Sequence, residues 1–73
     1  MGRKETDIAY FISFCIEQYK MRHHLSGNEV MQIFDKHHVT EYLADNFEVL
    51  HTQSYQLLLK DIEEFIQHKE KEL

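Results

Sequence analysis

The stretch Ile8-Ala-Tyr-Phe-Ile-Ser-Phe-Cys-Ile-Glu-Gln-Tyr19 is apolar around most of a helical circumference. With about 100° between successive residues, one face of this helix collects Ile8, Ile12, Cys15, Ile16 and Tyr19, with Phe11 at its edge. A second apolar cluster, beside that edge, consists of Tyr10, Phe14 and Met21. The remaining polar stripe is narrow and consists of Ser13, Glu17 and Lys20. Because such a helix is normally central in a bundle or shared with another chain, we predict a helix over residues 6–24.

A break and a new helix start follow this first helix. Ser26 and Glu29 have the spacing of a capping box, in which each side chain binds the backbone amide at the other position. They predict a second helix over residues 27–38. Its inner face is formed by Val30, Ile33 and Phe34.

Two further helices are predicted in the rest of the chain. Thr40 precedes a third helix over residues 41–50, and Thr52 or Ser54 can cap a fourth that extends to about Lys69. The last helix has a regular amphipathic face, formed by Tyr55, Leu58, Leu59, Ile62, Phe65 and Ile66.

Length and composition agree with a helical fold. The chain has 73 residues with two glycines and no proline, whereas a β-sandwich or barrel needs many turns that use these residues. Helices of unequal length cannot share one long parallel seam. We therefore predict an all-α fold, a compact orthogonal bundle of about four helices. It forms a single domain over residues 1–73, with a frayed start (1–5) and tail (69–73).

Histidine is unusually frequent, with six copies at His23, His24, His37, His38, His51 and His68. Imidazole binds zinc, copper and nickel, but no His-x-x-x-His or His-Glu-x-x-His spacing is present. Each histidine lies in the last turn of a predicted helix or just after it. There an imidazole can bind free carbonyl groups and meet the negative end of the helix dipole. We therefore expect no metal site and no cofactor, and we interpret His37, on an apolar face, as a core histidine.

The other chemically reactive side chains do not favour an enzyme. Cys15 lies in the middle of the first predicted helix on its most apolar face, whereas a catalytic thiol needs a nearby base and a lowered pKa. Asp61, Glu63 and Glu64 fit a solvated helix face better than a general acid-base pair. No Ser-His-Asp grouping or Gly-rich phosphate loop is present. We therefore predict a buried, inert thiol and no catalytic residues.

The charge of the chain is unevenly distributed. The net charge is −5, and residues 26–66 contain eight acidic but only two basic side chains. Such a surface repels phosphate, so we expect no nucleic-acid partner, although residues 26–50 resemble a helix-turn-helix in outline. The longest near-apolar run, residues 8–16, is far shorter than the roughly 20 residues of a membrane span. We expect no membrane contact and, with one cysteine and no signal peptide, a cytoplasmic location.

More apolar side chains are present than one small core needs. The surplus consists of Tyr10, Phe14, Met21 and Leu57. Aromatic and methionine side chains gathered on one side of a helix are typical of a contact surface, and self-association is one route to stability for a small domain. We predict a non-enzymatic protein-interaction module that forms homo-oligomers through these residues. The alternatives are a helix-turn-helix-type DNA-binding regulator and, third, a metal-dependent enzyme in which histidines from different helix ends converge.

Five short segments carry a family resemblance: Phe14-Cys-Ile-Glu-Gln-Tyr-Lys20, Leu25-Ser-Gly-Asn-Glu-Val30, Val39-Thr-Glu-Tyr-Leu43, Val49-Leu-His-Thr-Gln53 and Asp61-Ile-Glu-Glu-Phe-Ile66. In this order they resemble a family of short bacterial proteins catalogued as domain of unknown function 3791, over residues 8–66. The resemblance implies a bacterial, intracellular, stand-alone helical domain and supplies no catalytic residues. Members are sometimes encoded beside ADP-ribosyltransferase-like proteins, which implies a protein partner encoded nearby and an accessory or antitoxin role.

Overall fold

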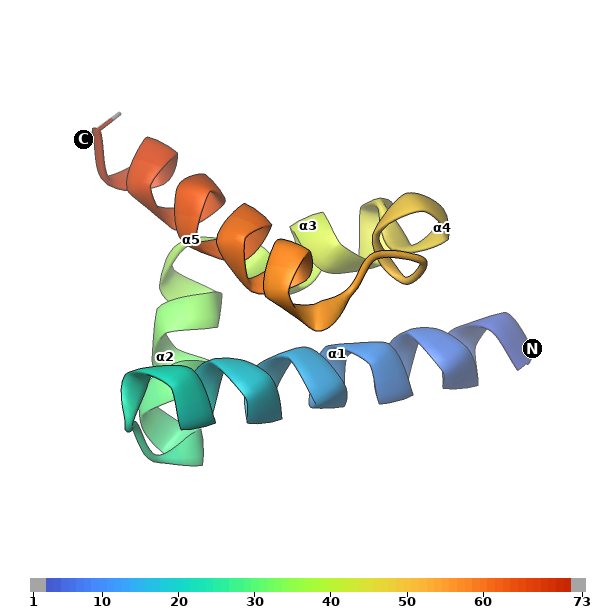
Figure 1. Ribbon diagram of the computed structural model, residues 1–73, viewed down its shortest axis with the longest axis horizontal. Coiled ribbons are helices and arrows are strands. Elements are labelled where there is room, and N and C mark those ends of the chain that lie inside the picture. The colour runs from blue at the N-terminus through green and yellow to red at the C-terminus, as the bar shows by residue number, and fades with distance from the viewer. Residues whose placement is uncertain (1–2, 72–73) are drawn as a thin grey trace.

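The computed structural model describes residues 3–71, and these form five helices and no strand. The helices are α1 (Arg3–His23), α2 (Gly27–Lys36), α3 (Val39–Asp45), α4 (Phe47–Leu50) and α5 (Tyr55–Lys71). In Figure 1, α2 stands steeply against the C-terminal end of α1, α5 runs obliquely above α1, and the short helices α3 and α4 connect α2 to α5. The predicted all-α bundle is confirmed, with four helices of seven residues or more and one single turn.

One apolar cluster joins all five helices. Its buried members are Cys15, Tyr19, Val30, Phe34, Val39, Leu43, Leu50, Leu58, Leu59, Ile62 and Ile66. Phe11, Ile12 and Ile16 pack against this cluster from α1, so the face predicted to be internal does face the core. Each large apolar side chain buried in this way contributes roughly 1.5–3 kcal/mol. The cluster contacts α1 along one face only, and this leaves the opposite face of the helix uncovered.

The turn between α1 and α2 is formed by two local capping motifs. The Leu25 amide donates to the Lys20 carbonyl at 3.0 Å while His24 adopts a left-handed conformation with φ 56°, which is the Schellman arrangement. The predicted capping box then begins α2. The Glu29 amide donates to Ser26 Oγ at 3.1 Å, and the Ser26 amide donates to Glu29 Oε1 at 2.8 Å. Both motifs are local, so the sequence determines this corner directly.

The third predicted helix, residues 41–50, is divided into α3 and α4. Asn46 separates them. Its side-chain amide donates to the Tyr42 carbonyl at 2.8 Å, and its backbone amide donates to the same oxygen at 3.1 Å. Asparagine competes with the helix for backbone hydrogen bonds in this way, so the chain turns here and α4 approaches α1.

The observed helix ends differ from the predicted ones by a few residues. α1 begins at Arg3 rather than near residue 6, and α5 continues to Lys71. The outermost residues of the predicted frayed ends, 1–2 and 72–73, lie outside the described part of the chain.

The capping box provides a direct test of the α1–α2 corner. We expect Ser26→Ala to lower the free energy of unfolding by about 1 kcal/mol, because the Glu29 amide loses its acceptor. Ser13→Ala, the same change on an exposed position inside α1, is the matched control. It should leave stability unchanged or raise it slightly, since alanine is the better helix former. Urea denaturation of the three proteins measures both effects, and equal losses in the two variants would contradict the capping argument.

Candidate interaction surface

A shallow groove lies between the first half of α1 and the turn formed by α4. Its lining consists of Lys4, Asp7, Tyr10, Phe11, Phe14, Phe47, Glu48 and His51. Five of these eight residues are aromatic or histidine, and α1 supplies three of the five. The groove is therefore an apolar surface with charged residues at its edge.

The floor of the groove is held in place by a row of ring contacts. Phe11 and Phe47 meet edge to face at 5.4 Å between ring centroids, and Phe47 stacks on His51 at 4.4 Å. His51 Nδ1 lies 2.6 Å from the Phe47 carbonyl oxygen. Because a carbonyl oxygen only accepts, Nδ1 carries the proton and donates it there. These contacts fix three rings in one orientation, as a binding surface requires.

An ion pair joins the two helices at the edge of the groove. Lys4 Nζ lies 2.9 Å from Glu48 Oε2, and both side chains are exposed. The hydrogen bond from Lys4 and its positive charge lower the pKa of the Glu48 carboxyl group. An exposed pair of this kind adds little stability, so its main effect is to give the groove a charged border.

The four side chains predicted as contact residues are all exposed, with Tyr10 at 73%, Phe14 at 44%, Met21 at 58% and Leu57 at 58%. None of them belongs to the core. Tyr10 and Phe14 line the groove, whereas Met21 and Leu57 are not among its lining residues. That these side chains form an interface stays a prediction.

Sequence reasoning missed the contribution of α4. The sequence predicts one helix over residues 41–50 with His51 at its end, and it places neither Phe47 nor His51 next to the first helix. Phe47 is indeed mostly buried, but one side of its ring meets Phe11 in the groove. Asn46 was the available signal, since asparagine favours turns over helix interiors. The break at Asn46 brings α4 to α1.

The histidines occupy helix ends, as predicted from the sequence. His23 ends α1, His37 and His38 follow α2, His51 follows α4, and His68 lies in the last turn of α5. His24 and His38 adopt left-handed backbone conformations that glycine usually takes, with φ of 56° and 59°. His38 Nδ1 also lies 3.3 Å from Glu41 Oε2, and this hydrogen bond lowers the pKa of the Glu41 carboxyl group.

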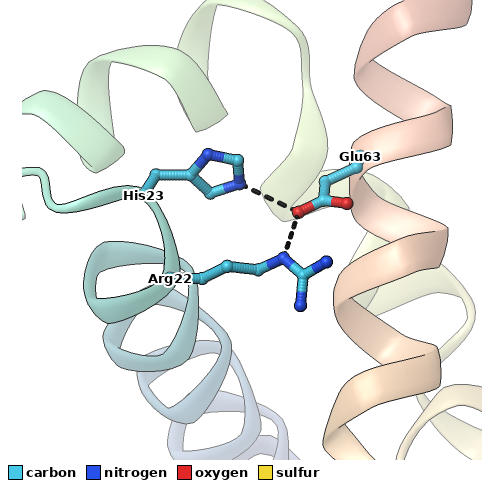
Figure 2. A network of polar contacts seen from close by, with 3 residues as sticks. All are labelled: Arg22, His23 and Glu63. Carbon is cyan, nitrogen blue, oxygen red and sulfur yellow. Dashed lines mark hydrogen bonds and ion pairs between the residues drawn. The ribbon is translucent and has the colours of Figure 1, made fainter.

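A polar cluster connects the end of α1 to α5 (Figure 2). Arg22 Nε and His23 Nε2 both approach Glu63 Oε2, at 2.7 and 2.9 Å. The interpretation of Glu63 as part of a solvated face is wrong, because its side chain is only 23% exposed. Tyr19 stacks on His23 at 4.2 Å between centroids, and burial together with the charge of Glu63 raises the pKa of Tyr19.

The buried histidine of the core lies near this cluster. His37 is 6% exposed, and its Nε2 lies 3.7 Å from Glu70 Oε2 on α5. Glu70 also contributes to the raised pKa of Tyr19, so Glu63 and Glu70 act on the same tyrosine. Polar contacts thus bring the end of α1, the residue after α2 and α5 together at one end of the bundle.

The chemistry available at these positions is limited. Cys15 is fully buried, and burial raises the pKa of its thiol to about 12, so it is not a nucleophile near neutral pH. Among residues 3–71, no group of three or more His, Cys, Asp or Glu side chains has an arrangement that could hold a metal ion. Within the same residues no helix is long and apolar enough to cross a membrane.

Comparison with known proteins identifies the chain at the level of a family. Residues 10–69 match the family described as "Protein of unknown function (DUF3791)". The chain belongs to this family. No curated protein and no solved structure gives a significant match. The family description assigns no activity, so the function of this DUF3791 protein is inferred from its own geometry.

The Arg22–His23–Glu63 contacts predict a measurable role in joining α1 to α5. We expect Glu63→Ala to lower the free energy of unfolding by about 1–2 kcal/mol, because a partly buried carboxylate that binds the Arg22 guanidinium and the His23 ring is removed. The exposed neighbour Glu64 provides the control, and Glu64→Ala should stay within about 0.5 kcal/mol of the parent. Thermal and urea unfolding measure both, and equal effects would show that the cluster contributes no stability.

Burial of the single thiol predicts how this DUF3791 protein reacts with alkylating reagents. At pH 8 we expect iodoacetamide to modify Cys15 only through unfolding, because the raised pKa keeps the thiol protonated and the core covers it. The rate should therefore increase with urea along the unfolding curve and reach that of a free thiol when unfolding is complete. Mass spectrometry follows the reaction. A native-state rate equal to that of free cysteine would contradict the burial of Cys15.

Proposed function

We propose that this protein is a non-enzymatic interaction module that forms homo-oligomers through the outer face of α1. One observation carries the proposal. Tyr10, Phe14 and Met21 all lie on the exposed side of α1, roughly opposite the side from which Cys15 and Tyr19 enter the core. The helix therefore has two apolar faces, and the fold covers only one of them.

The uncovered face continues into the aromatic groove between α1 and α4. Tyr10 and Phe14 continue into the aromatic groove, so the exposed residues join an apolar surface that reaches α4. Contiguous apolar patches of this kind are typical of protein contact sites, while scattered single residues are not. Aromatic side chains at the centre of a patch supply most of the binding energy in many interfaces.

The rest of the chain supports binding rather than catalysis. The cysteine is buried with a raised pKa, and four of the histidines have partners elsewhere, either carboxylates or, for His51, a backbone carbonyl. We place the protein in the cytoplasm of a bacterium, in an accessory or antitoxin-like role with a partner encoded nearby. The family resemblance and the free thiol support this placement.

DNA binding is a weaker interpretation of the same fold. The helix that would enter the groove of DNA is interrupted at Asn46, and it exposes Glu41, Asp45 and Glu48. Carboxylates at these positions repel phosphates, whereas DNA-binding surfaces neutralise them with Lys and Arg. The acidic surface therefore favours a protein partner.

Self-association can be tested with two tyrosine variants that differ only in location. We expect multi-angle light scattering of the parent to give at least twice the 8.9 kDa chain mass. Tyr10→Glu should raise the dissociation constant about 100-fold or more, since each copy loses a buried aromatic side chain. Tyr55→Glu is the control, because Tyr55 is also exposed but belongs to α5 and does not line the groove.

The two variants also separate loss of binding from loss of folding. Circular dichroism should show the same helix content for both, since neither side chain belongs to the core cluster. Phe14→Glu should repeat the result of Tyr10→Glu. A parent that is monomeric at every accessible concentration would overturn the proposal, and so would equal dissociation by Tyr55→Glu.

A further inference from the structure

The exposed face of α1 has the spacing of a coiled-coil seam. Asp7, Tyr10, Phe14, Glu17 and Met21 follow each other at alternating intervals of three and four residues, and all five are exposed. Such intervals keep side chains on one stripe, which packs against the stripe of a facing helix. α1 has 21 residues and is therefore about 30 Å long, enough for a seam of several layers.

Two carboxylates in this stripe determine whether a second copy of the helix packs parallel or antiparallel to the first. In a parallel pair each residue faces its equivalent, so Glu17 would face Glu17 and Asp7 would face Asp7 of the second copy. Like charges in direct opposition at a helix interface are destabilising. A parallel pair would therefore place two repulsive layers in a short seam.

An antiparallel pair removes both repulsions. With the two-fold axis midway between Phe14 and Glu17, these two residues face each other across the interface. The carboxylate of Glu17 is bound at 3.1 Å by Lys20 Nζ of its own helix, so its methylene groups remain to contact the ring of Phe14. An antiparallel pair shifted by one heptad would instead bring Asp7 against Glu17, so charge also selects the register.

The outer layers of this antiparallel pair are complementary as well. Tyr10 faces Met21 of the second copy, and sulfur–aromatic contacts of this kind are favourable. Asp7 faces the last turn of α1 in the second copy, which is basic because it contains Lys20, Arg22 and His23. Met21 of each copy also lies beside the aromatic groove of the other, and its flexible side chain suits an irregular apolar surface.

We infer that the occupant of the exposed α1 face is a second copy of this chain, bound antiparallel about a two-fold axis between Phe14 and Glu17. This inference rests on the proposed homo-oligomer and adds its geometry. Because the contact is isologous, each copy supplies the same residues to both sides and the assembly closes as a dimer.

Cysteine cross-linking distinguishes the two orientations. Tyr10→Cys and Met21→Cys are prepared separately, with the buried Cys15 retained. A short bismaleimide linker is added to each variant by itself and to a mixture of the two. The antiparallel dimer predicts a covalent dimer in the mixture but little in either variant alone. The parent protein, with only Cys15, is the control and should not be linked.

Each result either supports or overturns the geometry. Linking of Tyr10→Cys to itself and of Met21→Cys to itself would show a parallel pair and overturn the inference while leaving the homo-oligomer intact. A mixture of the two cysteine variants that is dimeric by light scattering but is not linked would show that α1 is not the seam. A monomeric parent would overturn the homo-oligomer itself, and the antiparallel pair with it.

Charge variants give a second measurement that does not depend on the engineered thiols. At low salt, Asp7→Lys should raise the dissociation constant about tenfold, because it places a cation opposite the basic last turn of α1 in the second copy. Asp45→Lys, on the exposed side of α3, should change it less than about twofold. Glu17→Gln should also have little effect, whereas tighter association of that variant would indicate the parallel pair and overturn the inference.

Discussion

The structure depends on one constraint: α1 is apolar around most of its circumference, and the rest of the chain is too short to surround it. α2 to α5 are packed against the face that contains Cys15 and Tyr19, and they bury it completely or nearly so. A chain of 73 residues buries only about 60% of its unfolded surface. The opposite face of α1 therefore remains in solvent with its large side chains, and the location of the candidate site follows from this geometry.

The helices of this bundle also have to end in a chain that has few glycines and no proline. Histidine takes the left-handed position after α1 and after α2, where glycine is the usual residue. A left-handed conformation costs a residue with a side chain roughly 1–2 kcal/mol, and contacts such as that of His38 with Glu41 offset part of it. The helix-end location accounts for the histidines more simply than a metal site, because it applies to each of them separately.

Whether a feature could be predicted from the sequence depends on how far apart in the chain the interacting residues are. The capping box at Ser26, the internal face of α1 and the helix-end histidines depend on residues within one or two turns, and the sequence predicts them correctly. The edge-to-face contact of Phe47 with Phe11 and the binding of Glu63 by Arg22 join residues about 40 positions apart. Their contact depends on the crossing of the helices, which no local pattern specifies. The same limit explains why Tyr10 and Phe14 were found as contact candidates but the groove beside them was not.

Association and stability are coupled in a domain this small. The polar cluster of Arg22, His23 and Glu63 fixes α1 against α5 at one end, and the Phe11–Phe47 contact fixes it against α4 at the other. A partner that binds only the folded chain stabilises it by mass action, so the free energy of unfolding of a self-associating module rises with protein concentration. In the proposed homo-oligomer, the exposed face of α1 would be a source of stability as well as the binding surface. Substitutions there should affect the proposed dimer and, through it, the concentration dependence of unfolding, while substitutions in the two anchoring clusters should affect the isolated chain directly.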